Sequence, residues 1–161
     1  MLNNGHYFSE KYNDKFRWLS YWHQINEVLR LKPKNVLEVG SGNKTVYDYL
    51  KRRGIAVFCA DINSKLKPDF LASATNLKGI ENCQFDVVLC CQVLEHLPFE
   101  KFEASLKELK GFAKDLLFFL CLIAAPTLNL IFTCPCWEKE LFSLRFQGSI
   151  KANSPTDITG K

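Results

Sequence analysis

The chain has 161 residues, of which 47% are hydrophobic and 24% are charged, and its formal net charge is +4. This length fits one globular domain, and the composition excludes a disordered or fibrous chain. The basic residues are spread along the sequence, so we expect no nucleic-acid partner.

The N-terminus and the cysteines indicate the compartment. No basic segment followed by an apolar stretch marks a secretory signal at the N-terminus. The cysteines number seven, which is odd, and most of them lie in apolar runs. Reduced, buried thiols explain this pattern better than a disulfide framework does. We therefore expect a cytoplasmic protein.

The first segments are an arm and a helix. Residues 1–14 are polar and aromatic, and they predict an irregular N-terminal arm. From Lys15 to Leu31 apolar residues recur every three or four positions, which predicts an amphipathic helix. Pro33 is expected to end this helix.

Beyond Pro33, short apolar runs alternate with helical segments. This spacing predicts an α/β fold: a Rossmann-like, doubly wound and mostly parallel sheet with helices on both faces. The expected helices cover residues 45–53 and 98–112, and the expected strands cover residues 35–39, 55–60, 69–71, 85–90 and 116–123.

A glycine-containing turn follows the first predicted strand. Glu38, Gly40 and Gly42 form an acid-x-Gly-x-Gly pattern, and a helix is expected directly afterwards. Such a unit brings backbone N–H groups to the edge of a sheet, where a ligand can approach the main chain. A phosphate-binding loop would need glycine at Glu38 and Asn43, and a dinucleotide GxGxxG would need it at Thr45. Both of these patterns are incomplete.

Two further features follow in order. The second predicted strand ends in Asp61, where a carboxylate in a βαβ unit can accept hydrogen bonds from both hydroxyls of a ribose. The third feature is the segment Phe85–Leu97, FDVVLCCQVLEHL. Together the three features resemble the class I S-adenosylmethionine-dependent methyltransferases, and the third is similar to motif IV of their type 11 branch. The resemblance covers residues 34–112.

The resemblance implies that S-adenosylmethionine binds at the carboxyl ends of the first, second and fourth strands. Glu38 would help to fix the turn and the amino group of the methionine moiety, and Asp61 would bind the ribose. Ser73 stands where family members commonly have an acid for the adenine amino group, so adenine recognition would rest on backbone groups and apolar walls. The implied cofactor-binding residues are Glu38, Gly40, Ser41, Gly42, Asp61, Ile62, Ala74, Cys91 and Gln92.

The chemistry of methyl transfer demands positioning more than a universal catalytic residue. His96 is a candidate general base near neutral pH. However, the VLEHL segment occurs in family members with unlike substrates, which indicates a structural role. The fourth strand lacks the (Asp/Asn)-Pro-Pro-Tyr signature of enzymes that methylate planar amino groups of nucleobases or glutamine. We therefore expect a small-molecule acceptor.

The resemblance ends near Ala124. Family members continue with an antiparallel pair of strands, whereas residues 125–161 show no clear period, so we expect the sheet to lack its usual C-terminal strands. The expected organisation is an arm and helix at 1–33, a Rossmann-like cofactor-binding core at 34–124 and a divergent or remnant tail at 125–161. A truncated, non-catalytic remnant or binding module that keeps the core stays open as the alternative.

Three further interpretations concern metals, membranes and self-association. Cys134 and Cys136 form one CxC pair with no histidine nearby, so no metal site is expected. Residues 116–132 are apolar enough for a short membrane span, but Pro126 and Asn129 interrupt them, and a buried strand is favoured. An exposed fifth strand would be a sticky edge through which copies of the chain could associate.

Overall fold

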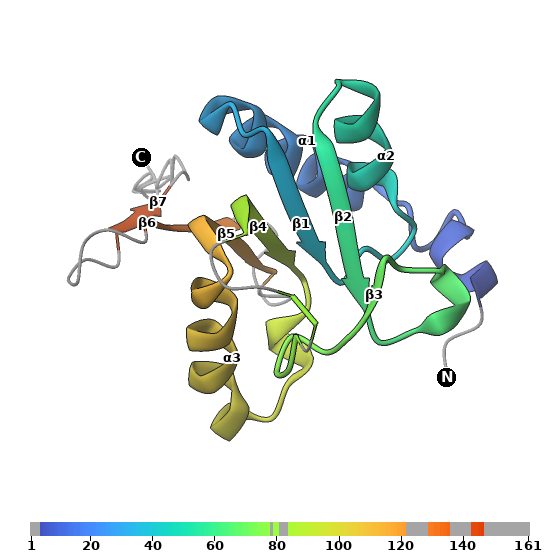
Figure 1. Ribbon diagram of the computed structural model, residues 1–161. Coiled ribbons are helices and arrows are strands. Elements are labelled where there is room, and N and C mark those ends of the chain that lie inside the picture. The colour runs from blue at the N-terminus through green and yellow to red at the C-terminus, as the bar shows by residue number, and fades with distance from the viewer. Residues whose placement is uncertain (1–3, 78, 81–83, 122–128, 136–142, 147–161) are drawn as a thin grey trace, which may run out of the picture.

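The computed structural model describes residues 4–77, 79–80, 84–121, 129–135 and 143–146, with side chains as far as Lys114. It shows one sheet with helices on both faces (Figure 1). The strand order is β3-β2-β1-β4-β5-β6-β7. The pairs from β3 through β5 are parallel, and β6 and β7 are antiparallel to their neighbours. The Rossmann-like fold predicted from the sequence is confirmed.

The element bounds agree closely with the predicted ones as far as β5. The helices are α1 (Lys15–Leu31), α2 (Thr45–Arg52) and α3 (Phe99–Gly111), and short 3-10 helices lie at Asn4–Phe8, Ser64–Leu66 and Leu94–His96. The strands are β1 (Asn35–Val39), β2 (Ala56–Asp61), β3 (Phe70–Leu71), β4 (Phe85–Cys91), β5 (Ala113–Cys121), β6 (Asn129–Pro135) and β7 (Ser143–Phe146).

The strand order reverses direction at β1, which pairs with β2 on one side and β4 on the other. Because all three strands are parallel, their carboxyl ends meet at one edge of the sheet. In open α/β sheets, ligands bind outside the carboxyl ends at such a reversal point. The fold therefore singles out the segments after β1, β2 and β4.

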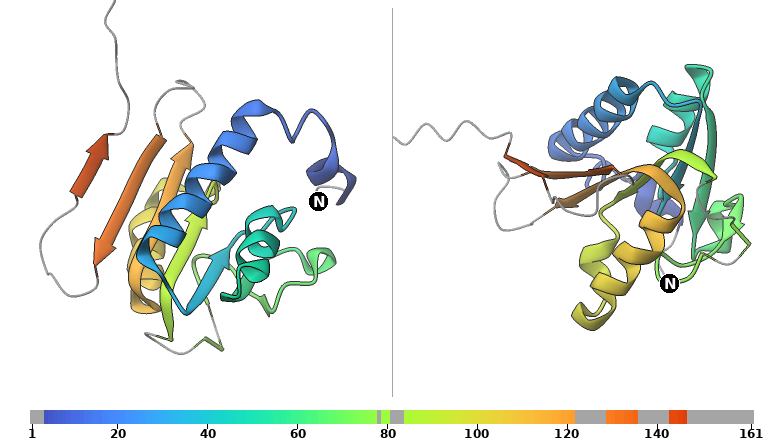
Figure 2. Two further views of the ribbon diagram at one scale, coloured as in Figure 1. Left: turned by 90° about the horizontal axis from the view of Figure 1, so that it is seen from above. Right: turned by 60° about the vertical axis from the view of Figure 1, so that its left-hand side comes forward.

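Two apolar cores lie on opposite faces of the sheet, as the alternation of side chains along a strand requires. Val36 packs with residues of α1 and α2, such as Val28 and Leu50. Its neighbour Leu37 packs in the other core with Leu109 of α3 and with the segment that follows β3. Figure 2 shows α1 and α2 on one face and α3 on the other.

The ends of α1 are fixed by local hydrogen bonds. The Asp14 carboxylate accepts a hydrogen bond of 2.8 Å from the backbone N–H of Arg17, which caps the first turn. At the other end Lys32 takes a left-handed φ of 51°, and its N–H donates to the carbonyl of Leu29. The helix thus ends at Leu31, two residues before Pro33.

The prediction that the sheet lacks its C-terminal strands is wrong, because β6 and β7 extend it beyond β5. β5 lies between β4 and β6, so it is not the exposed edge that the sequence suggested. The backbone groups on the outer side of β5 pair with β6 instead. Leu130, Ile131, Phe132 and Thr133 are residue types that favour strands, and they were the local signal for β6.

The described residues contain no helix that is long and apolar enough to cross a membrane. The apolar segment 116–132, considered above as a short span, contributes instead to β5 and β6 where it is described.

Burial in the core predicts which leucines hold the fold together. Leu50 of α2 is 0% exposed, whereas Leu71 of the edge strand β3 is 66% exposed. Leu50→Ala should lower the free energy of unfolding by about 2–5 kcal/mol, because it leaves a cavity under α2. The same truncation at Leu71 should change it by less than about 1 kcal/mol. Urea denaturation of both variants checks this, and equal losses would contradict it.

Candidate functional site

The turn between β1 and α2 has an unusual backbone. Gly40, Gly42 and Lys44 all take left-handed φ values, of 80°, 50° and 61°. The Gly40 N–H donates a hydrogen bond of 2.8 Å to the carbonyl of Ala60, near the end of β2. A Cβ atom on Gly40 would overlap the side chain of Val93, which follows β4. Glycine at this position therefore lets the ends of three strands converge.

Glu38 is a buried carboxylate beside this turn, with only 6% of the residue exposed. Burial raises its pKa to about 8, although a hydrogen bond from the backbone N–H of Tyr47 partly opposes the rise. Its Oε2 atom is buried and has no hydrogen-bond partner among the described residues. A buried carboxylate normally needs a partner. Glu38 is therefore suited to receive a donor, and best a cation, from a ligand.

Asp61 lies at the end of β2 and is largely buried. Its Oδ1 atom accepts a hydrogen bond of 2.8 Å from the backbone N–H of Asn63, which fixes the carboxylate. The next residue, Ile62, is 77% exposed and offers an apolar surface beside it. The pair presents an oxygen acceptor and an apolar wall at the same corner of the sheet.

The segment after β4 completes the strand ends. Gln92 takes a φ of 55°, which is uncommon for a residue other than glycine. Its side-chain amide donates a hydrogen bond of 3.3 Å to the Ser20 hydroxyl of α1. Cys91, at the end of β4, is half-buried. This turn is held between the glycine turn on one side and α1 on the other.

Glu95 is a second carboxylate near these ends, in the 3-10 helix that follows β4. Its Oε2 atom is buried without a hydrogen-bond partner among the described residues. Burial is the main cause of its raised pKa, which the charges of His96 and Arg17 oppose. His96 itself is exposed. No described contact links His96 to the glycine turn, so its role as a base stays a prediction.

The N-terminal arm lies over the glycine turn. A Cβ atom on Gly42 would come within 3.6 Å of both the Tyr7 ring and the Tyr12 hydroxyl. The pKa of Tyr7 is raised, first by burial and then by the negative charge of Asp61. The guanidinium of Arg17 lies 4.4 Å from the centre of the Tyr12 ring. The arm therefore joins α1 to the strand ends.

Asn43 fastens the arm to the turn. Its side-chain amide donates to the carbonyl oxygen of the Asn13 side chain at 3.0 Å, and its own carbonyl oxygen accepts from the Thr45 N–H at 3.1 Å. The Asn13 amide in turn donates to the backbone carbonyl of Tyr7 at 2.9 Å. This chain of hydrogen bonds connects the start of α2 with the N-terminal arm; Asn43 and Tyr7 are 36 residues apart in the sequence.

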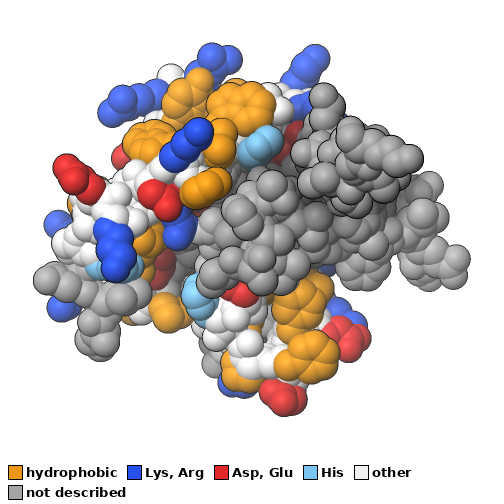
Figure 3. Space-filling view, turned by 180° about the vertical axis from the view of Figure 1, so that it is seen from behind, with side chains coloured by type: hydrophobic (Ala, Val, Ile, Leu, Met, Phe, Trp, Pro, Cys, Tyr) orange, Lys and Arg blue, Asp and Glu red, His pale blue; other side chains and the backbone are white. Residues whose placement is uncertain are grey.

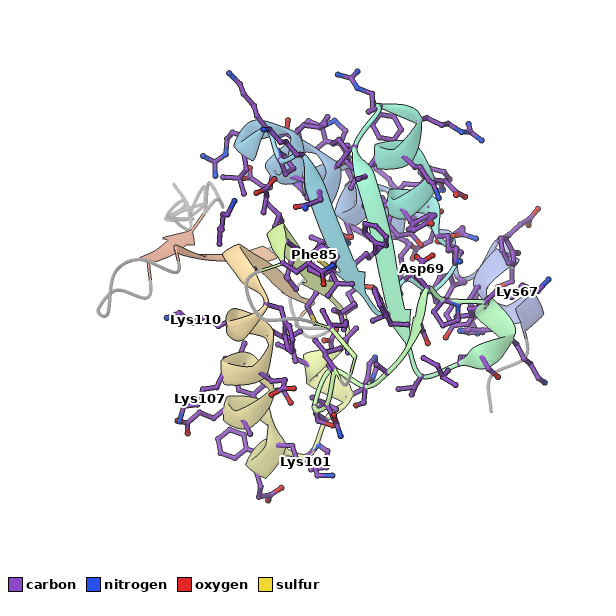
Figure 4. All side chains as sticks on the ribbon, viewed as in Figure 1. Lys67, Asp69, Phe85, Lys101, Lys107 and Lys110 are labelled. Atoms are coloured by element: carbon purple, nitrogen blue, oxygen red, sulfur yellow. The ribbon has the colours of Figure 1, made fainter. Side chains whose placement is uncertain are left out.

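Other predicted residues lie apart from the turn. Ala74 is buried and packs in the core on the α3 side. The neighbouring hydroxyls of Ser73 and Thr75 lie 3.0 Å apart in a local turn. Asp69, labelled in Figure 4, accepts a hydrogen bond of 2.8 Å from the Cys59 N–H and so positions β3 beside β2.

Sequence reasoning missed Tyr7, Asn43 and Glu95 as members of this region. An asparagine side chain commonly accepts a hydrogen bond from the backbone N–H two residues later, so the Asn43–Thr45 bond was open to prediction. The contacts of Tyr7 and the orphaned oxygen of Glu95 depend on tertiary packing.

The described residues contain no cluster of three or more side chains suited to a metal ion. The CxC pair Cys134 and Cys136 lies outside the residues whose side chains are described.

Comparison with known families gives a direct match. Residues 37–116 match the family model described as "Methyltransferase domain". The match begins within β1, includes the turn, Asp61 and the segment after β4, and ends in β5. This part of the chain belongs to that family. A comparison with curated protein sequences finds no match.

Solved structures share the fold of this methyltransferase domain. The methyltransferase domain of bacterial CtHen1 is 17% identical, with a TM-score of 0.55, and the alignment covers 65% of this chain and 66% of that one. Magnesium protoporphyrin IX methyltransferase from Synechocystis PCC 6803, solved with bound SAH, is 17% identical with a TM-score of 0.54. The alignment covers 66% of this chain and 56% of that one. The PH0226 protein from Pyrococcus horikoshii OT3 is 15% identical with a TM-score of 0.53, and the alignment covers 74% of this chain and 66% of that one. The chain thus spans less than two thirds of each of these proteins.

Gly40 is predicted to be irreplaceable for two separable reasons. Gly40→Ala combines a left-handed φ of 80° with an overlap against Val93, whereas Gly54→Ala has a similar φ of 82° and open space around the new methyl group. The left-handed φ alone should lower the free energy of unfolding by about 1–2 kcal/mol in each variant. Gly40→Ala should cost at least about 1 kcal/mol more, because Val93 must move. Thermal or urea unfolding checks this difference, and equal losses would contradict the role of Val93.

Proposed function

We propose that this chain binds S-adenosylmethionine at the carboxyl ends of β1, β2 and β4 and transfers its methyl group to a small-molecule acceptor. The observation that carries the proposal is the buried Oε2 atom of Glu38, which lacks a partner among the described residues beside the glycine turn. The family match and the fold shared with methyltransferases support it.

The residues of the site fit the chemical groups of this cofactor. The α-ammonium of its methionine part is the cation that the Glu38 carboxylate needs. Asp61 already has one oxygen occupied by the Asn63 N–H, and its other oxygen would accept from a ribose hydroxyl. The exposed side chain of Ile62 would pack against the adenine ring. The further proposed contacts are Gly40, Ser41, Gly42, Ala74, Cys91 and Gln92.

The bound cofactor supplies a methyl group on a sulfonium, which is a strong leaving group. The protein then has to position the acceptor in line and exclude water. Tyr7 and Tyr12, which lie against Gly42, are placed to shield the site. Glu95 offers an acceptor-side carboxylate, since its orphaned oxygen could bind an N–H or O–H group. The absence of the (Asp/Asn)-Pro-Pro-Tyr signature supports a small-molecule acceptor over a nucleobase or glutamine.

The alternative considered above, a remnant that keeps the core without catalysis, drew its support from the apparent loss of the C-terminal strands and from Lys44 in place of a frequent third glycine. β6 and β7 remove the first of these supports, because they continue the sheet where loss was expected. The family match favours the methyltransferase interpretation as well.

Asp61 provides the first test of the proposal. Asp61→Asn keeps an oxygen for the Asn63 N–H but replaces the other oxygen with a donor. Affinity for S-adenosylhomocysteine should fall about 10–100-fold, the value of a hydrogen bond to a charged group. The matched control is Asp69→Asn, since the Asp69 carboxylate accepts a hydrogen bond from the Cys59 N–H within the sheet, and this variant should bind normally. Calorimetric titration measures both.

Failure of the unaltered chain to bind the nucleoside would refute the cofactor assignment. If it binds, incubation with donor labelled in the methyl group and a panel of small acceptors tests transfer. Binding without transfer to any acceptor class, including nucleic acid and protein, would refute the catalytic part alone.

Glu38 makes the affinity depend on pH. Below its pKa of about 8 the carboxyl group of the free protein is protonated, and an ammonium ligand must displace that proton. Affinity for S-adenosylhomocysteine should therefore rise between about pH 6 and pH 8, by up to tenfold per pH unit. Glu38→Gln should bind weakly and without this slope. An equal slope in both proteins, measured by calorimetry, would exclude Glu38 as its source.

The raised pKa of Glu38 gives the stability of the fold the opposite pH dependence. The carboxyl ionises near 4.5 when unperturbed and near 8 in the folded, unliganded protein. Across this window the folded state holds a proton that the unfolded state releases, so the free energy of unfolding should fall as pH rises. Glu38→Gln should remove this contribution, which urea denaturation at several pH values can measure.

A further inference from the structure

The outer side of α1 exposes an aromatic ridge. Its members are Phe16, Trp18, Leu19 and Trp22, which are 59%, 56%, 45% and 58% exposed. Figure 3, which views the molecule from the side of α1, shows hydrophobic side chains gathered on this face beneath a border of Lys and Arg. Tyr49 of α2 is also exposed, at 43%. We call the four α1 residues the α1 ridge.

The ridge is not part of the core. α1 buries a different side, formed by Tyr21, Gln24 and Val28, against the sheet. A helix on a globular protein normally presents polar residues to solvent opposite its buried side. Contiguous exposed apolar patches of this kind mark interaction sites. We therefore expect the α1 ridge to contact a binding partner.

A groove between α1 and α2 adjoins the ridge. It has a volume of about 640 Å³. From α1 it is lined by Trp18, Trp22, Ile25 and Leu29, and from α2 its polar lining includes Asp48 and Arg52. The groove runs along the outside of the helices rather than at the strand ends. It extends the apolar surface and is separate from the candidate methyltransferase site.

The charges around this surface are mostly positive, although the half-buried Glu27 pairs with Arg30 at 2.8 Å. Both helices end at the edge of the sheet where β1 and β2 begin (Figure 1), which brings their C-terminal cations to one border. The exposed carboxylates on the two helices and their caps are Asp14 and Asp48, and the exposed cations are Lys15, Arg30, Lys32, Lys51, Arg52 and Arg53. The surface thus complements an anionic partner that can also accept aromatic side chains.

An anionic lipid surface matches this arrangement best. Tryptophan and phenylalanine settle at the boundary between headgroups and acyl chains, while surrounding cations contact lipid phosphates. A nucleic-acid strand would follow cations interleaved with aromatic rings along a groove. Here Asp48 lines the groove, and most of the cations lie at the helix ends.

We propose that the α1 ridge, together with the cations around it, docks this chain onto the surface of an anionic lipid bilayer. α1 would lie in the plane of the headgroups, with Trp18 and Trp22 below them and Lys15 and Arg52 among them. This is attachment to one leaflet, without a spanning segment. It does not depend on methyl transfer.

Sedimentation of the full chain with vesicles tests the proposal. The chain should bind vesicles of phosphatidylcholine with phosphatidylserine, and binding should weaken with added salt and with phosphatidylcholine alone. The double variant Trp18→Ser, Trp22→Ser should bind at least about tenfold more weakly, because apolar surface no longer leaves water. Phe99→Ser is the matched control, since Phe99 on α3 is 88% exposed away from the ridge, and it should bind normally.

The cations have their own control. Lys15→Gln and Arg52→Gln should each weaken binding to the anionic vesicles about fivefold and leave binding to neutral vesicles unchanged. Lys107→Gln, on α3 at the other face of the sheet (Figure 4), should have no effect. Circular dichroism and S-adenosylhomocysteine binding verify that each variant folds.

Tryptophan fluorescence adds a direct readout of insertion. The emission of the unaltered chain should shift to shorter wavelength with anionic vesicles, and the double variant, which keeps Trp137, should lose most of the shift. Binding that is equally strong in the double variant would overturn the proposal. A lack of vesicle binding would also overturn the proposal. In that case the ridge would have another occupant, which light scattering would show as a second copy of the chain or titration as a nucleic acid.

Discussion

The approach of the Gly40 backbone to its neighbours determines the geometry of the candidate site. Its N–H bonds the carbonyl of Ala60, and the space where a Cβ would stand is taken by Val93. One residue without a side chain thus brings the ends of β1, β2 and β4 together. Parallel strands place their carboxyl ends on one edge by topology alone, and this contact also brings the segment after β4 against the turn after β1. The positions of Glu38, Asp61 and Gln92 follow from it.

The buried carboxylate of Glu38 is an unfavourable group at this convergence. Leaving a carboxylate oxygen buried without a donor destabilises the free protein, and the raised pKa of Glu38 expresses that penalty. Its neighbours across the sheet, Cys59 on β2 and Leu89 on β4, are apolar and could accommodate an apolar side chain in its place. The buried carboxylate raises the free energy of the unliganded protein, and a cationic ligand would remove this penalty. The difference contributes to the free energy of binding. Such conflicts between local rules and the overall fold are expected at functional sites.

The sequence predicted the fold well where the signal is local. The periodicity of α1, which buries one side, and the mostly apolar run of β1, which is buried on both faces of the sheet, gave the observed bounds. β6 was missed although Leu130–Thr133 favour a strand, since its pairing with β5 depends on tertiary structure and Pro126 suggested an irregular segment. The Asn43–Asn13 bond and the orphaned oxygen of Glu95 likewise depend on segments far apart in the chain. The cofactor contacts and the division into 1–33, 34–124 and 125–161 stay predictions.

α1 connects the two surfaces of this molecule. On its inner side Ser20 accepts the hydrogen bond from Gln92, and Arg17 stacks on Tyr12 of the arm that lies over Gly42. Trp18 and Trp22 alternate with these residues along the same two turns and project outward. A helix is stiff over two turns, so a force on its outer side moves its inner side as well. Attachment through the ridge would therefore fix the helix that carries the arm's anchor, and would favour one position of Tyr7 and Tyr12 over the glycine turn. The placement of aromatic residues on both sides of α1 thus provides a physical route from surface attachment to access at the strand ends.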